Sequence, residues 1–79
     1  MGAGNLSREV LMRYLSALAR HTKNVWYMHS SLKAFESDDE VERMTDILEG
    51  APKMKLIRID WLIQTEIVER RESEGAAED

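Results

Sequence analysis

The sequence contains no cysteine, which excludes disulfide bonds, thiolate zinc sites and cysteine nucleophiles. It also has no apolar run near the roughly 18–20 residues that a membrane span needs, which excludes a transmembrane segment. The N-terminal stretch lacks a charged region followed by an apolar one, so we expect no secretory signal. These absences predict a soluble, intracellular chain and leave open whether its location is cytoplasmic or nuclear.

What is present is typical of one small globular domain. The 79 residues are 43% hydrophobic and 33% charged, too apolar for disorder throughout. A chain this short buries only about 60% of the surface that its unfolded form exposes. Without disulfides or metals, oligomerisation or docking is a common remedy. Size alone therefore favours a protein-binding role.

The net charge of −4 conceals a segmented pattern along the chain. Residues 1–35 carry five basic residues against one acid, and residues 36–50 carry seven acids against Arg43. Bases outnumber acids again in residues 51–71, and the last eight residues have a net charge of −4. A segmented chain can present a local basic face although its overall charge is negative.

Hydrophobic periodicity predicts an all-α domain of four helices joined by short loops. Short connections favour antiparallel neighbours, so we expect an up-and-down or irregular bundle. The helical domain is expected over residues 6–72, between a disordered N-terminus (residues 1–5) and a disordered acidic C-terminal tail (residues 73–79). The predicted helices cover about residues 7–21, 25–35, 38–49 and 53–72.

Capping residues indicate where these helices begin. Ser7 and Asn24 are plausible N-caps, and Ser37 with Glu40 fits a capping box. Gly50 is expected to close the third helix, and Pro52 suits the first turn of the last one. A short strand over residues 25–28 is the competing interpretation for the second helix, because this stretch is β-prone.

The last helix carries two apolar stripes. One is an ordinary core stripe, and the other lies elsewhere on the circumference. Either this helix is central and covered on both sides by the other three, or its second face docks another chain. The core stripe consists of Leu56, Ile59, Ile63 and Ile67, and the second stripe of Met54, Ile57, Trp61 and Val68.

The first part of the chain offers a basic face, with the aromatic residues Trp26 and Tyr27 nearby. Three interpretations apply to it: a solvated face that balances the acidic third helix through pairing, a nucleic-acid contact, or a site for an acidic protein. Five spaced charges are far from the dense cluster usual in nucleic-acid binders, which favours the first. The residues are Arg8, Arg13, Arg20, Lys23 and Lys33.

No constellation of residues predicts catalysis. His21 and His29 are eight residues apart, which does not suit two metal ligands on one helical turn. His29 is expected on the inner side of the second helix, as a hydrogen-bonded core residue. We therefore expect a non-enzyme without a metal or cofactor.

These observations favour a protein–protein interaction or assembly module that docks through the second stripe of the last helix. Its partner is expected to be another protein or a second copy, as a homodimer. Nucleic-acid binding through the first helix is the alternative function, and no membrane partner is expected.

Overall fold

The computed structural model describes the backbone of residues 6–78 and the side chains of residues 6–72. Within that part the chain is all-α, which confirms the predicted small four-helix domain and rejects the strand alternative for residues 25–28. The disorder predicted for residues 1–5 lies outside the described residues. The elements are α1 (Arg8–Ala19), α2 (Val25–Ser31), the 3-10 helix η2 (Leu32–Ala34), α3 (Asp38–Gly50) and α4 (Leu56–Glu78).

The predicted N-caps all accept a backbone hydrogen bond. The Ser7 hydroxyl accepts from the N–H of Val10 at 3.3 Å, and the Asn24 side chain accepts from Tyr27 N–H at 2.9 Å. The Ser37 hydroxyl accepts from Glu40 N–H at 3.4 Å. Each bond satisfies one of the free N–H groups in the first turn, so local sequence fixes where α1, α2 and α3 begin.

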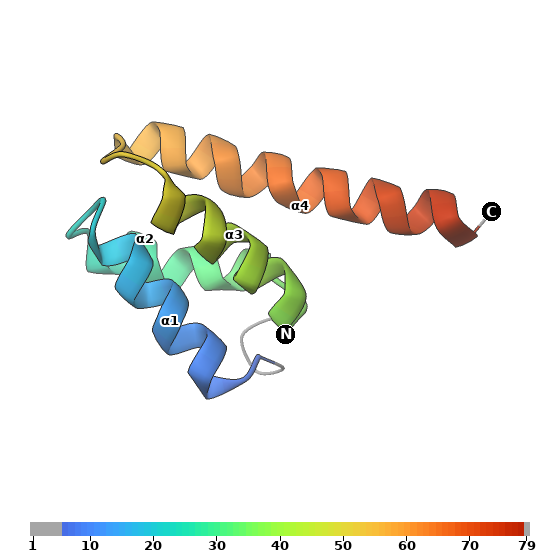
Figure 1. The fold of residues 1–79 in the computed structure, drawn as a ribbon, viewed down its shortest axis with the longest axis horizontal. Helices are drawn as coiled ribbons and strands as arrows, with labels where there is room; N and C mark the ends of the chain where they lie inside the picture. The colour runs from blue at the N-terminus through green and yellow to red at the C-terminus, as the bar shows by residue number, and fades with distance from the viewer. Residues whose placement is uncertain (1–5, 79) are drawn as a thin grey trace.

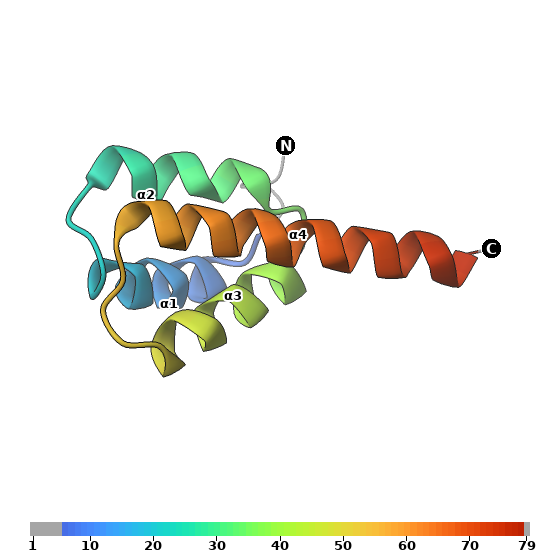
Figure 2. The ribbon, with the colours of Figure 1, turned by 90° about the horizontal axis from the view of Figure 1, so that it is seen from above.

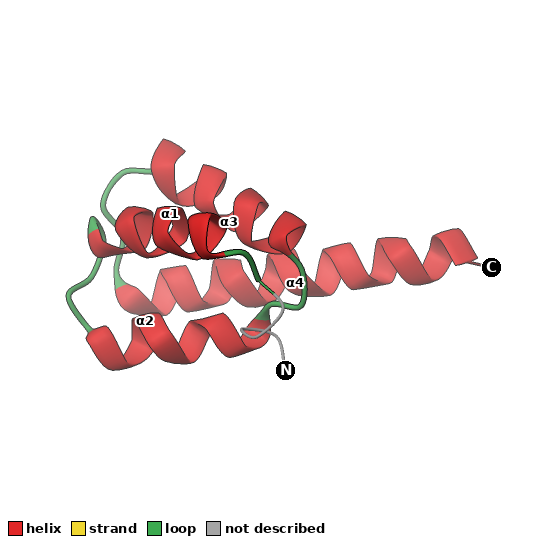
Figure 3. Ribbon diagram, turned by 90° about the horizontal axis from the view of Figure 1, so that it is seen from below, coloured by secondary structure: helices red, strands yellow, loops and turns green. Residues whose placement is uncertain are grey.

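Successive helices alternate in direction, so α4 runs in the same direction as α2 (Figures 1 and 2). The helices α1 and α3 start at the same end, where Ser7 N–H donates to the Asp38 carboxylate at 2.8 Å. In Figures 1 and 2, α4 lies on one side of the other helices, over the space between α2 and α3, and its C-terminal part projects beyond them. Figure 3 shows the opposite side, where α1 and α3 lie in front of α4. One broad face of α4 is therefore left uncovered.

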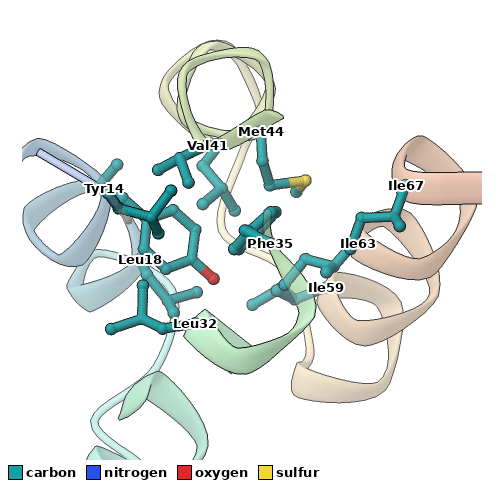
Figure 4. Packing of buried hydrophobic residues seen from close by; sticks show 12 residues of the cluster. Tyr14, Leu18, Leu32, Phe35, Val41, Met44, Ile59, Ile63 and Ile67 are labelled. Carbon is teal, nitrogen blue, oxygen red and sulfur yellow. The ribbon is translucent and has the colours of Figure 1, made fainter. Parts of the chain in front are cut away.

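The core sits where the four helices converge around Phe35 (Figure 4). The rings of Tyr14 and Phe35 meet edge to face with centroids 5.3 Å apart. The buried Tyr14 hydroxyl lies 2.7 Å from Ser31 Oγ, which donates to the Met28 carbonyl at 2.9 Å. The hydroxyl proton of Ser31 is used in the hydrogen bond to the Met28 carbonyl, so Tyr14 is the donor to Ser31. The polar end of the largest core side chain is thus satisfied internally.

The start of α4 corrects the prediction for the connection after α3. The helix begins at Leu56 rather than at Lys53, so Pro52 lies in the connector before α4 and not in a first helical turn. The buried His21 explains this difference. Its Nε2 lies 2.9 Å from the Leu48 carbonyl, and its Nδ1 accepts the N–H of Met54 at 3.2 Å. This tertiary bond engages the Met54 N–H outside the helix, which overrides the local helical pattern.

The other end of α4 also differs from expectation. The helix continues to Glu78, past the predicted end near Arg71 or Glu72. Helix propagation adds one hydrogen bond per residue, and the alanines and glutamates of this stretch are good helix formers. Side chains of residues 73–79 lie outside the described residues, and the disorder predicted for that tail stays a prediction.

The orientation of α2 was predicted wrongly in part. His29 and Val25 are exposed, whereas Ser31 is buried. Two hydrogen bonds explain this orientation of α2. Ser31 binds the Tyr14 hydroxyl, and the Tyr27 hydroxyl donates to Asp60 of α4 at 3.1 Å. These two bonds hold the edge of α2 that carries residues 27 and 31 inward, and they turn His29 out to solvent.

Among the described residues, none of the helices is both long and apolar enough to cross a membrane.

Candidate protein-docking face

The two apolar stripes of α4 have opposite environments. Ile59, Ile63 and Ile67 are at most 4% exposed and face the core. In contrast, Ile57 is 80% exposed, Trp61 56% and Val68 52%. The interpretation of α4 as a helix covered on both sides is therefore wrong for the described part of the chain. We call the exposed stripe of Ile57, Trp61, Gln64 and Val68 the outer face of α4.

Met54 does not belong to this face, although it was predicted there. It precedes the first residue of α4, is partly buried, and packs against the core. Its N–H is held by His21, which directs the connector toward the body of the domain. A helical wheel extended over residue 54 fails because the helix has not yet begun there.

The members of the outer face follow one line along the helix. Their sequence spacings of four, three and four residues are those of a coiled-coil seam. Between Trp61 and Val68 the surface has a shallow hollow of about 320 Å³, lined also by Gln64, Thr65 and Glu69. This hollow exists because the small Thr65 separates larger side chains. The outer face thus combines a protruding indole with a recess beside it.

One flank of the outer face has its charged groups engaged within the chain. Asp60 accepts the Tyr27 hydroxyl, and Arg71 donates to the Ala34 carbonyl at 3.1 Å. The other flank carries Arg58, Thr65, Glu69 and Glu72 on its helical turns. Arg58 stacks over the Trp61 ring with its guanidinium carbon 5.2 Å from the ring centroid. A cation placed over an indole holds the side chain in one orientation.

Ion pairs fix α4 to the acidic start of α3. Arg43 pairs with the buried Glu66, and Arg70 pairs with Asp39. Arg71 lies 3.5 Å from Glu36 and 3.6 Å from Glu40. Together with the isoleucine stripe, these contacts set the rotation of α4 about its axis, and the outer face consequently points away from the domain.

Arg13, a member of the predicted basic face, is used inside the chain. Its guanidinium lies 3.0 Å from Asp46 and 2.8 Å from Glu49 of α3. Hydrogen bonding to Glu49 and then Asp46 raises the pKa of Arg13 above its already high usual value. This pairing with the acidic third helix is the first of the three interpretations given for the basic face.

The other predicted basic residues divide between the two ends of the molecule. Arg8 lies at the start of α1, and Lys33 lies in η2. Arg20 and Lys23 line a hollow of about 160 Å³ after the end of α1, together with Lys53 of the connector. Lys53 was missed as part of this group, although the pattern of short loops between antiparallel helices places both connections at one end.

In the described part of the chain, no group of three or more histidine, aspartate or glutamate side chains could hold a metal ion. His21 is held by Leu48 and Met54, and His29 lies at the surface.

Comparison of the chain with protein-family models, with curated proteins and with solved structures finds no match.

Proposed function

We propose that this protein is a protein-interaction or assembly module that docks through the outer face of α4. One observation carries the proposal: three large apolar side chains lie exposed on one line of a helix whose opposite side is locked into the core. Exposed apolar residues scattered singly are ordinary, but an aligned set around a tryptophan is typical of interaction surfaces.

The fixed position of α4 supports the same role. A surface that is already ordered loses less conformational entropy on binding than a flexible one. The core isoleucines and the pairs of Arg43, Arg70 and Arg71 hold the helix before any partner arrives. Trp61 is further oriented by Arg58. The role proposed is binding and involves no catalysis.

Site-specific photo-crosslinking in the cells that make the protein tests this proposal. A photoreactive amino acid at Gln64, in the centre of the outer face, is expected to capture a protein. Adding Trp61→Glu should abolish the crosslink. Trp26→Glu, which changes an even more exposed tryptophan on α2, should preserve it. Absence of a crosslink, or equal loss with both variants, would refute docking at this face.

The hollow formed by Arg20, Lys23 and Lys53 supports a second candidate function, nucleic-acid binding. Three cationic side chains around one recess suit a phosphate group, and such contacts weaken steeply with salt. In a gel-shift assay at low salt, the double variant Lys23→Glu with Lys53→Glu should lose a shift that Arg8→Glu, near the other end of α1, retains. A wild-type protein that gives no shift at micromolar concentration would exclude this function.

A further inference from the structure

We propose that the partner of the outer face of α4 is a second copy of this chain, with the two α4 helices packed antiparallel about a two-fold axis level with residues 62 and 63. This inference rests on the proposed function and adds the identity of the occupant. Three properties of the face support it: the order of its apolar residues, the hollow beside Trp61, and the distribution of charge along the flank that carries Arg58, Glu69 and Glu72, which we call the open flank.

The apolar residues match themselves when the helix direction is reversed. With the axis level with residues 62 and 63, Ile57 of one chain meets Val68 of the other, and the reverse contact forms by symmetry. Such a two-fold interface uses the same patch on both chains. Gln64 of each chain then lies opposite Trp61 of the other, near the centre of the interface.

The same arrangement fills the hollow. Antiparallel pairing places Trp61 of one chain beside residues 64–68 of the other, which include the recess lined by Gln64, Thr65 and Val68. Each indole then enters the partner's recess, and two such contacts form per dimer. A tryptophan buried in a well-packed pocket is the residue type that most often dominates binding energy.

Charge along the open flank selects the antiparallel direction. Arg58 lies at its beginning, and Glu69 and Glu72 lie at its end, all exposed. Antiparallel pairing sets Arg58 of one chain against the two glutamates of the other, twice per dimer. Parallel pairing would set this flank against the opposite flank of the partner, so Arg58 and the two glutamates would not meet, and it would align the two helix dipoles unfavourably. The charges of the opposite flank do not oppose this choice, because Asp60 and Arg71 already have partners within the chain.

Sedimentation velocity of the purified full chain over a wide concentration range tests the pairing. We expect the mass to rise from 9.1 kDa to twice that value. Trp61→Glu should weaken dimerisation by at least about 10-fold, as expected for a central tryptophan. Trp26→Glu is the matched control and should leave the dimer constant unchanged. A mass that stays at 9.1 kDa at every concentration would overturn self-association, while a Trp61-dependent crosslink to another protein would still support the proposed function.

A charge exchange tests the antiparallel direction. Arg58→Glu and Glu72→Arg should each weaken the homodimer about 3- to 10-fold, because every substitution creates two like-charge contacts. Mixing the two variants should restore association, since each acidic flank then faces a basic one. If neither variant weakens the dimer, or if mixing restores nothing, antiparallel pairing is wrong.

Discussion

Tyr14 makes stability sensitive to alkaline pH. Burial raises the pKa of this fully buried phenol to about 12 from its usual 10. The unfolded chain loses this proton near pH 10 and the folded chain only near pH 12. The folded state is therefore favoured fully below pH 10, and this contribution is lost as the pH rises to about 12.

We expect this loss to amount to roughly 2–3 kcal/mol, from about 1.4 kcal/mol per pKa unit. Urea unfolding of wild type and Tyr14→Phe between pH 9 and pH 12 measures it as a difference. The variant should be less stable by about 1 kcal/mol at pH 9, because it lacks the bond to Ser31, and should then decline less steeply. If the unfolding free energies of the two proteins fell equally between pH 9 and pH 12, the assignment of this pH dependence to Tyr14 would be wrong.

His21 is expected to be a structural residue, and His29 supplies its matched control. Because Nδ1 accepts the Met54 N–H, the imidazole is neutral with its proton on Nε2, which donates to Leu48. His21→Ala leaves two backbone groups without partners and should cost about 2–3 kcal/mol of unfolding free energy at pH 7.5. The exposed His29→Ala should change it by less than about 0.5 kcal/mol.

Long-range nitrogen–proton NMR spectra check the tautomer of His21 directly. A proton on Nδ1, or equal stability losses in the two alanine variants, would contradict the assigned role.

At the scale of the element, α4 permits a comparison between two isoleucines on one helix. Ile63→Ala opens a cavity in the core and should lower the unfolding free energy by about 2–5 kcal/mol. Ile57→Ala removes an exposed side chain and should change it by less than about 0.5 kcal/mol. Chemical unfolding measures the two free energies, at a protein concentration low enough that only the monomer is present. Equal losses would mean that the outer face belongs to the core.

The elements themselves were largely predictable from sequence. Ser7, Asn24 and Ser37 signal their helices through local hydrogen bonds, and the isoleucine stripe of α4 follows the helical period. What sequence reasoning missed depends on long-range contacts. The bond from Met54 to His21, 33 residues apart, sets where α4 begins and removes Met54 from the docking face.

In the candidate site, too, features that follow from local periodicity were predictable, and features that depend on long-range contacts were not. Ile57, Trp61 and Val68 could be predicted because three points on one helix share a face by periodicity alone. The engagement of Arg13 by Asp46 and Glu49 could not, because it needs the packing of α1 on α3.

For the whole molecule, the described buried core ends well before the C-terminus. Among the described side chains, which end at residue 72, Ile67 is the last buried one and Arg71 is the last residue of α4 with a cross-helix ion pair. A chain restricted to residues 6–72 should therefore unfold with a free energy within about 0.5 kcal/mol of the full chain. Urea titrations followed by circular dichroism would show this, and a loss of more than about 1 kcal/mol would place the domain boundary further along the chain.

One side of α4 packs against the core and the other side faces solvent. Binding of any partner to the outer face is therefore thermodynamically linked to folding. A ligand that binds only the native chain raises stability by RT ln(1 + [L]/Kd), about 2.7 kcal/mol at a hundred times Kd. The heat-denaturation midpoint then reports occupancy: it climbs with the protein's own concentration if copies pair, and with added partner if another protein binds.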